Sequence, residues 1–260
     1  MDRLQRIAKS MQPKGGIEAV GVPKYVALYN RLLASIESGD WKPGDQLPPE
    51  TELARFVPVS LGTVQKALRM LADHGIVVRR HGHGTFVAGA PATKNAAEIR
   101  NFRFLADDGK SLLPLYTRVL AIEATKEKGP WSRFFVDEVN FVRITRLVNV
   151  NLEFQNYCRL YLPASRFGVF LKYGPHDLDG AAVTHLLTER FNAPTLRFVH
   201  HLRAIDLPSD TCKILNVSIG SSGHEWEMFG YTYRNAPITY QHVYMPAHER
   251  RLELRDSPIE

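Results

Sequence analysis

Two helical patterns are separated by only a few residues near Pro58, and this short connection limits the folds open to the chain. The first pattern starts around Glu50, and Pro58 ends it because proline cannot continue a helix. The second begins at Ser60, whose hydroxyl can cap the free backbone N–H groups of Gly62 and Thr63. Two short helices joined by so tight a turn are typical of a helix-turn-helix.

Apolar residues at helical spacing define the rest of this unit. A longer helix is predicted from Pro23 to Ser38, and Gly39 ends it. In the short helix we expect Leu53, Ala54 and Phe56 to face inward. In the third helix, which Gly75 closes, the buried stripe is Val64, Ala67, Leu68 and Leu71, and Thr63, Gln65, Lys66 and Arg69 face outward.

The segments IVVRR and TFVA follow as two short strands joined by HGHG. Helix, helix, tight turn, helix and hairpin make a winged helix-turn-helix, whose third helix enters the major groove of DNA. A metal site at His81 and His83 is one alternative, but zinc needs three or four ligands, and the nearest other candidate is His74. A solvated hairpin without DNA contact is a second alternative. We interpret HGHG as the tip of the wing.

Charge and composition restrict the class of protein. The net charge is +6, and residues 1–90 hold 12 Lys and Arg against 8 Asp and Glu. A basic small segment joined to a nearly neutral larger one fits a nucleic-acid-binding module attached to another domain. No apolar run approaches the roughly 18 residues of a membrane helix, and the two cysteines form no CxxC pair. We expect a soluble cytoplasmic protein with no membrane partner, cofactor or bound metal.

The larger part of the chain predicts an α+β domain with a mainly antiparallel sheet. After a linker over residues 90–99, six strand-like runs appear: LYTRVLAIEA, VNFVRITRLV, FQNYCRLYLP, TLRFVHHLRAI, HEWEMFGYTYR and ITYQHVYMP. Helical patterns, notably DGAAVTHLLTERF and PSDTCKILNV, lie between them. Cys158 and Cys212 stand in these patterns as buried cysteines, and Glu225 and Glu227 share one strand face that we expect to be solvated.

The N-terminal unit resembles the DNA-binding domain of GntR-type bacterial transcription regulators over about residues 23–89. The motifs that carry the resemblance are PGDQLPPETELARF, VSLGTVQKAL and GIVVRRHGHGTFVA. The family commonly has Arg where this chain has Thr51, Leu61 and Gln65, and Ser where it has Pro49. The DNA-binding residues that we expect are Thr51, Ser60, Gly62, Thr63, Gln65, Lys66, Arg69, Arg80, His81, Gly82 and His83.

The order of the later elements resembles the UTRA effector domain of the HutC subfamily, which is similar in fold to chorismate lyase. The resemblance covers about residues 100–250, through Thr117-Arg118, Arg143 to Leu147, Tyr161-Leu162-Pro163 and the pattern from Leu215 to Tyr244. The expected organisation is then a flexible extension (1–20), a winged helix-turn-helix (21–89), a linker (90–99) and an effector-binding and dimerisation domain (100–252).

The resemblance implies a homodimeric regulator, most simply a repressor, that binds a double-stranded DNA operator and a small anionic effector. Guanidinium groups offer paired donors to a carboxylate or phosphate. The family often has a second Arg where Val148 stands and an acidic residue where Cys158 stands, so we expect a ligand less charged than a sugar phosphate, such as a monocarboxylate. The effector-binding residues that we expect are Arg118, Arg146, Gly180, Tyr233 and Tyr240.

The alternative is a small-molecule-transforming enzyme of chorismate lyase-like fold with an accessory DNA-binding module. An enzyme needs a base, a nucleophile or a metal cluster in a recognisable setting. His200 and His201 are adjacent on a strand, so their rings point to opposite faces and cannot share one ligand. No catalytic constellation emerges from the sequence, and we therefore expect a regulator.

Overall fold

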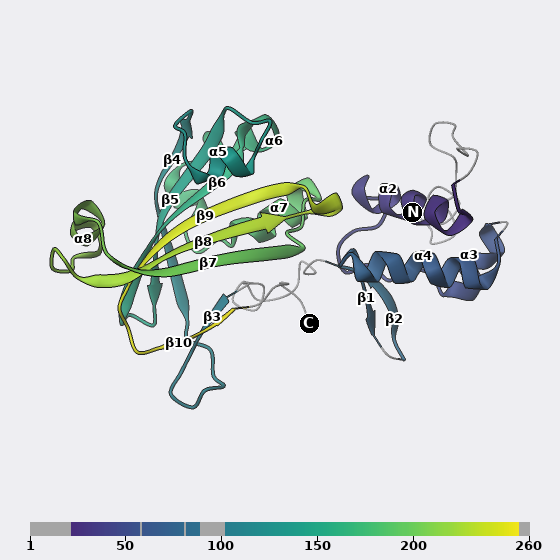
Figure 1. Ribbon diagram of the computed structural model, residues 1–260, viewed down its shortest axis with the longest axis horizontal. Coiled ribbons are helices and arrows are strands. Elements are labelled where there is room, and N and C mark those ends of the chain that lie inside the picture. Colours follow the sequence, from purple (N-terminus) through teal and green to yellow (C-terminus); the bar gives the residue numbers. More distant parts are fainter. Residues whose placement is uncertain (1–21, 58, 81, 89–101, 255–260) are drawn as a thin grey trace.

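The computed structural model describes residues 22–57, 59–80, 82–88 and 102–254. Figure 1 shows two lobes, a small helical one with a hairpin and a larger one built on a twisted sheet. The expected N-terminal extension (1–20) and linker (90–99) lie outside the described residues. None of the helices in the described ranges is both long and apolar enough to cross a membrane.

The small lobe is a winged helix-turn-helix, as predicted. Its elements are α2 (Lys24–Glu37), α3 (Glu50–Phe56), α4 (Leu61–Asp73), β1 (Val77–Arg80) and β2 (Gly84–Val87). The predicted stripe of α4 is fully buried, and the Ser60 hydroxyl accepts a hydrogen bond from the Thr63 N–H at 3.3 Å. One inward assignment was wrong, because Phe56 at the end of α3 is 40% exposed and only Leu53 of that helix is fully buried.

The wing is anchored to the segment between α2 and α3. β1 and β2 pair antiparallel, from Val77 opposite Val87 to Arg80 opposite Gly84. The Gln46 side-chain amide donates to the His83 carbonyl at 2.7 Å. Gly84 has φ +111°, and a Cβ there would lie 2.7 Å from the Gln46 nitrogen. The hairpin therefore needs glycine at this position both for its backbone conformation and for the approach of Gln46.

The large lobe is a six-stranded sheet in the order β4-β5-β6-β9-β8-β7, and every neighbouring pair is antiparallel. All six predicted strands are present: β4 (Leu115–Thr125), β5 (Phe141–Val150), β6 (Phe154–Pro163), β7 (Arg197–Asp206), β8 (Ser222–Tyr231) and β9 (Pro237–Pro246). The predicted α+β class with a mainly antiparallel sheet is confirmed.

One face of the sheet has two separate covers. At one end the cover is α6 (Ala164–Phe167), η1 (Gly168–Lys172), η2 (Pro175–Leu178) and α7 (Val183–Phe191), which pack on an apolar cluster of β5 and β6. At the other end lies a two-stranded sheet of β3 (Phe102–Leu105) and β10 (Arg251–Leu254), whose Phe102 and Leu252 pack on Val148 and Trp226. The sequence patterns did not predict β3 or β10.

The opposite face carries α5 (Pro130–Phe134) and α8 (Ser209–Leu215). Trp131 of α5 stacks on Tyr161 with ring centroids 3.9 Å apart, within an aromatic cluster that includes Tyr240. Cys212 of α8 is buried in a second cluster on this face, and Cys158 is buried on the first face. Both cysteines are free and buried, as expected.

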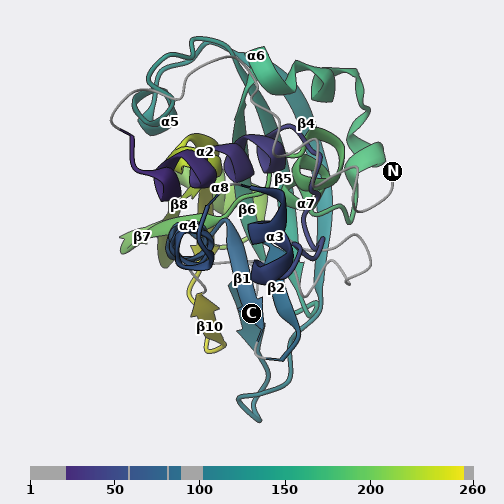
Figure 2. The same ribbon diagram turned by 90° about the vertical axis from the view of Figure 1, so that its right-hand side faces the viewer.

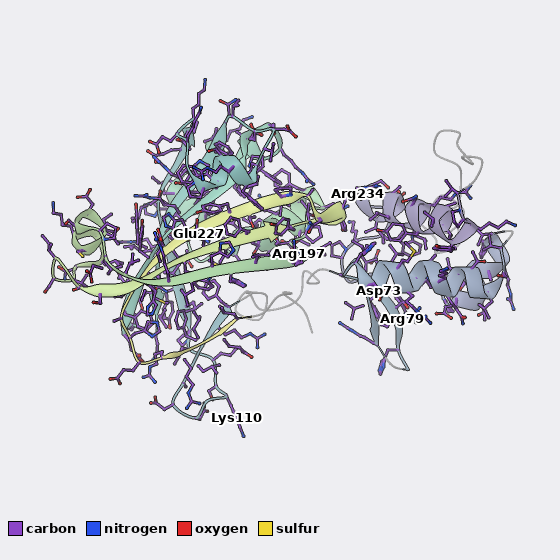
Figure 3. All side chains as sticks on the ribbon, viewed as in Figure 1. Asp73, Arg79, Lys110, Arg197, Glu227 and Arg234 are labelled. Carbon is purple, nitrogen blue, oxygen red and sulfur yellow. The ribbon has the colours of Figure 1, made fainter. Side chains whose placement is uncertain are left out.

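The two lobes meet at the C-terminal end of α2. The Asn192 side-chain amide donates to the carbonyls of Ile36 at 2.8 Å and Glu37 at 3.0 Å. Arg234, in the turn η3 (Tyr233–Asn235) between β8 and β9, forms a two-point ion pair with the Glu37 carboxylate at 2.6 and 2.9 Å. Figure 3 shows Arg234 at the tip of this turn, beside α2. The large lobe therefore holds α2 at two loops.

We predict that replacing Asn192 by Gly weakens this contact without straining the backbone. Asn192 is left-handed, with φ 46°, which glycine adopts readily, so the variant loses only the two amide hydrogen bonds. Each is worth ~0.5–1.5 kcal/mol, and the winged domain should unfold ~4–8 °C lower for each kcal/mol lost, measured by calorimetry.

The matched control is Asn216→Gly, because Asn216 is the left-handed cap of α8 within the effector domain. If this control lowers the transition of the winged domain as much as Asn192→Gly does, the amide of Asn192 does not hold the lobes together.

Candidate DNA-binding surface and effector site

The first half of α4 presents an uncovered polar surface. Gly62, Gln65, Lys66 and Arg69 are exposed, and Thr63 is half-buried. Figure 1 shows that the end of α4 beside α3 lies away from the effector domain, and in the turned view of Figure 2 the three helices and the wing are seen together. Thr51 of α3 and the cap residue Ser60 are exposed beside it. The expected recognition surface is thus accessible.

The basic side chains around this surface are held by neighbours. The Lys66 ammonium lies 3.8 Å from the centroid of the Tyr25 ring, and the Arg80 guanidinium lies 4.9 Å from that of Phe86. These aromatic supports place the two charges on opposite sides of α4, toward α2 and toward the wing. Positive charges in such flanking positions suit the two phosphate backbones that border a groove.

The tip of the wing has the backbone that close approach requires. Gly82 has φ +72°, and, its chain neighbours aside, none of the described residues has an atom within 4 Å of where its Cβ would stand. The His83 N–H donates to the Arg80 carbonyl at 2.9 Å and closes the turn. His81 lies outside the described residues. Within the described ranges, no group of three or more His, Cys, Asp or Glu side chains is arranged to hold a metal ion.

Arg146 is the buried cation of the effector domain. It lies on β5 between the two covers of the sheet and is only 8% exposed. Its Nε donates to Cys158 Sγ at 3.4 Å and its Nη2 to Gln241 Oε1 at 2.5 Å. In the described part of the chain these hydrogen-bond partners are neutral, and Arg146 forms no ion pair there. A desolvated cation without a counter-charge favours the binding of an anion.

Two more buried polar groups lie on the same face. Asn156 is two residues before Cys158 on β6, and Thr239 is two residues before Gln241 on β9. The Asn156 Oδ1 and Thr239 Oγ1 atoms are buried without a hydrogen-bond partner among the described residues. Buried polar atoms in folded proteins are nearly always paired, so an unpaired one marks a candidate ligand site. Asn156, opposite Val148, is a diagonal neighbour of Arg146, whereas Thr239 lies further along the sheet, beside Gly230.

The structure does not bring Arg118 or Tyr240 to Arg146. Arg118 is exposed and lies opposite Leu147, so it projects from the other face of the sheet. Tyr240 also faces the other side, where its hydroxyl donates to Glu227. Burial, and then this hydrogen bond, raise the pKa of Tyr240 above its ordinary value. Arg118 and Tyr240 therefore lie on the face of the sheet opposite to Arg146.

Gly180 and Tyr233 are also placed elsewhere. The Gly180 N–H donates to the Thr117 carbonyl at 2.8 Å, so this donor is used at the edge of β4, and α7 begins only at Val183. Tyr233 is 6% exposed and packs with the core of the winged domain, where burial raises its pKa. Tyr233 therefore contacts the winged lobe and lies away from Arg146 and its partners.

Gln241 and Asn156 were not among the predicted site residues, although the strand pattern of each carries a signal. Gln241 has the same strand parity as Val243 and Met245, which are buried on the inner face. Asn156 likewise shares parity with Cys158 and Leu160. An uncharged polar side chain at an inward position of an apolar strand needs a partner, and this is the pattern that would have found both residues.

The face that carries Glu225 is less solvated than expected. The Glu225 side chain is only 13% exposed, and its carboxylate pairs with His242 at 2.8 Å and with Arg203. Burial opposes ionisation, but the hydrogen bonds from Arg203 and His242 outweigh it and hold the pKa of Glu225 below its ordinary range. These groups are mutually satisfied, which is typical of a structural network.

We predict that Arg146→Met stabilises the protein in the absence of anions. Methionine fills similar space without a buried charge, and this gain exceeds the roughly 1 kcal/mol lost when Gln241 loses its donor. The free energy of unfolding in urea should rise by ~1–2 kcal/mol. Arg143→Met is the control, since Arg143 pairs with Glu123 and Glu127 on the other face of the strand. A loss of stability in Arg146→Met would contradict the description of Arg146 as an uncompensated charge.

Comparisons with known proteins identify both domains of the chain. Residues 24–87 match the family model of the bacterial regulatory proteins of the gntR family, and residues 134–250 match the UTRA domain. The histidine utilization repressor of Klebsiella aerogenes is 38% identical over 79 residues, which cover 30% of this chain and 33% of that protein. The match thus spans about a third of the length of the histidine utilization repressors that it resembles.

Two further matches, one to a protein and one to a solved structure, cover more of the matched chain. The probable fructoselysine utilization operon transcriptional repressor of Escherichia coli K12 is 24% identical over 249 residues, covering 88% of this chain and 93% of that one. The ligand-binding domain of a putative GntR-family transcriptional regulator from Bordetella bronchiseptica has a TM-score of 0.52 at 18% identity, covering 61% of this chain and 97% of that one, and it shows the fold. With a gntR-type DNA-binding domain followed by a UTRA domain, the chain belongs to the GntR family of bacterial regulatory proteins and has the architecture of its HutC subfamily.

Proposed function

We propose that this protein is a DNA-binding transcriptional repressor whose operator binding is controlled by a small anionic metabolite. The observation that carries the proposal is the uncovered N-terminal half of α4, flanked by basic side chains and by a glycine-tipped wing on the same lobe. The relatives named as repressors of histidine and fructoselysine utilization support a regulatory role.

In this proposal α4 reads the major groove of the operator. Gln65 is exposed near the start of the helix, and a glutamine amide pairs with the N6 and N7 atoms of adenine. Thr51, Ser60, Gly62 and Thr63 surround it, and Lys66, Arg69 and Arg80 contact phosphates. The wing tip, His81 to His83, lies against the backbone or the minor groove, where Gly82 permits close approach.

Operator recognition requires two copies of the chain. A single recognition helix reads only a few base pairs, which is too short an address in a genome. Proteins of this type solve the problem by binding two half-sites about one helical turn apart through a symmetric dimer. We therefore include a homodimer in the proposal, and light scattering of the free protein measures it directly.

The effector in this proposal binds at Arg146. The guanidinium is held by Gln241 and Cys158, and the unpaired oxygen of Asn156, a diagonal neighbour of Arg146, lies on the same face for a further polar contact. One buried positive charge matches one negative charge, so a monocarboxylate fits better than a sugar phosphate. Arg118, Gly180, Tyr233 and Tyr240 lie elsewhere and are not part of this proposed site.

We predict that Gln65→Ala lowers affinity for the operator by ~1–3 kcal/mol and leaves affinity for random DNA nearly unchanged. The operator is selected from a randomised duplex library with the full chain, and binding is measured by fluorescence anisotropy. The comparison variant is Arg80→Ala, which should weaken both complexes alike and reduce the log–log salt slope by about one unit. Equal losses on both DNAs in Gln65→Ala would exclude Gln65 as a base reader.

We predict that Arg146→Met binds the operator but no longer releases it when effector is added. A ligand shifts an equilibrium only through different affinity for the two states, and this variant lacks the charge that the ligand recognises. A thermal-shift screen of monocarboxylates and sugar phosphates identifies the effector, because a ligand at 100 times its Kd adds ~2.7 kcal/mol of stability. Arg143→Met should respond as wild type does, and full release of Arg146→Met from the operator would disprove the assignment.

A further inference from the structure

Glu50 places a carboxylate inside an otherwise basic DNA-facing surface. It is the first residue of α3 and its side chain is 32% exposed. Its Oε2 accepts a hydrogen bond from Gln65 Nε2 of α4 at 2.9 Å, and its Oε1 accepts one from Arg79 Nη2 of the wing at 3.2 Å. Figure 3 shows Arg79 on the hairpin below α4. One carboxylate therefore joins α3, the recognition helix and the wing.

This contact determines which way the Gln65 amide points. A carboxylate only accepts hydrogen bonds, so Gln65 must turn its NH₂ group toward Glu50 and its Oε1 away. Glu50 accepts one N–H, and among the described residues the Gln65 amide has no other hydrogen-bond partner. If Glu50 takes the N–H trans to Oε1, the N–H on the same side as Oε1 is left for a base. Arg79 holds the second carboxylate oxygen and fixes the direction from which Glu50 binds the amide.

The remaining donor and acceptor match adenine and not guanine. In the major groove adenine presents the N7 acceptor and the N6 amino donor, whereas guanine presents two acceptors, N7 and O6. An amide held with one free N–H next to Oε1 satisfies both adenine groups. Against guanine, Oε1 would face the O6 acceptor, and the two oxygens would repel each other. To avoid this repulsion the amide would have to flip, which would break its hydrogen bond with Glu50.

We infer that Glu50 is a specificity-determining positioning residue, which holds the Gln65 amide in the orientation that selects adenine over guanine. The inference rests on the proposed function, in which Gln65 reads a base. It explains why a negative charge is placed beside groups that must approach phosphates, where it would otherwise oppose binding. Glu50 acts through Gln65 and need not touch the DNA.

The test measures base preference and not only affinity. Duplexes are selected from a randomised library by the full wild-type chain, and the position read by Gln65 is the one at which Gln65→Ala loses discrimination. At that position wild type should prefer adenine over guanine by at least tenfold. Glu50→Ala should reduce this ratio to about threefold or less, while its affinity for random DNA stays the same or rises because a negative charge is removed.

Two further variants separate positioning from charge and from folding. Glu52→Gln removes one negative charge from the same turn of α3 and should keep the wild-type ratio. Glu50→Gln has nearly the shape of glutamate and should fold, but its neutral amide offers both donors and an acceptor, so Gln65 can turn over and the ratio should fall. In the Gln65→Ala background, Glu50→Ala should cause no additional loss of discrimination, because its effect passes through Gln65.

The outcomes distinguish this inference from the proposed function. If Gln65→Ala abolishes discrimination and both Glu50 variants keep the wild-type ratio, Glu50 does not position the amide and the base-reading role of Gln65 stands. If Gln65→Ala leaves every position of the selected operator unchanged, Gln65 reads no base and both ideas are wrong.

Discussion

The C-terminal end of α2 is the constraint on which the arrangement of the two lobes depends. The last carbonyls of a helix lack intrahelical partners and must find others. In α2 the carbonyls of Ile36 and Glu37 accept the amide of Asn192, and the Glu37 carboxylate accepts Arg234, so residues of the effector domain complete this helix. Because α2 packs on α4 in one core, holding α2 also sets the direction of the recognition helix.

The same two loops are joined to elements that lie on, or in, the sheet that carries Arg146. α7 covers one end of the sheet face that carries Arg146 and ends one residue before Asn192. β9 carries Gln241, and it follows directly on the turn that contains Arg234. In the proposed site a ligand at Arg146 and Gln241 would contact β9, which follows the turn η3 that holds Arg234 against α2.

Local periodicity predicted most of the fold. Which residues make up the candidate effector site depends instead on strand register and on contacts between segments far apart in the sequence. The stripes of α4 and the six strands follow from spacing within ten or so residues. Arg118 and Arg146 are both arginines on strands, but only the register of β4 on β5 shows that they project from opposite faces. Tyr233 packs in the core of the winged lobe, whose residues up to Ala88 lie far earlier in the chain, and no strand pattern can reveal this contact. In the sequence Glu50 is an ordinary acidic residue in the first turn of a helix, and only the packing of α3 on α4 shows its contact with Gln65.

Where this chain departs from its family, the residues at the proposed base-reading positions are neutral, and the positive charges that attract DNA lie beside them. Thr51, Leu61 and Gln65 stand where arginine is common, and all three are exposed, Leu61 by 41%. Arginine to guanine is the commonest specific contact in a major groove, whereas an amide suits adenine and an apolar side chain suits the thymine methyl group. The remaining cations, such as Lys66 on Tyr25 and Arg80 on Phe86, flank the surface. If the proposed contacts form, salt should weaken the phosphate contacts of every DNA alike, whereas discrimination between bases would depend on neutral groups that salt screens little.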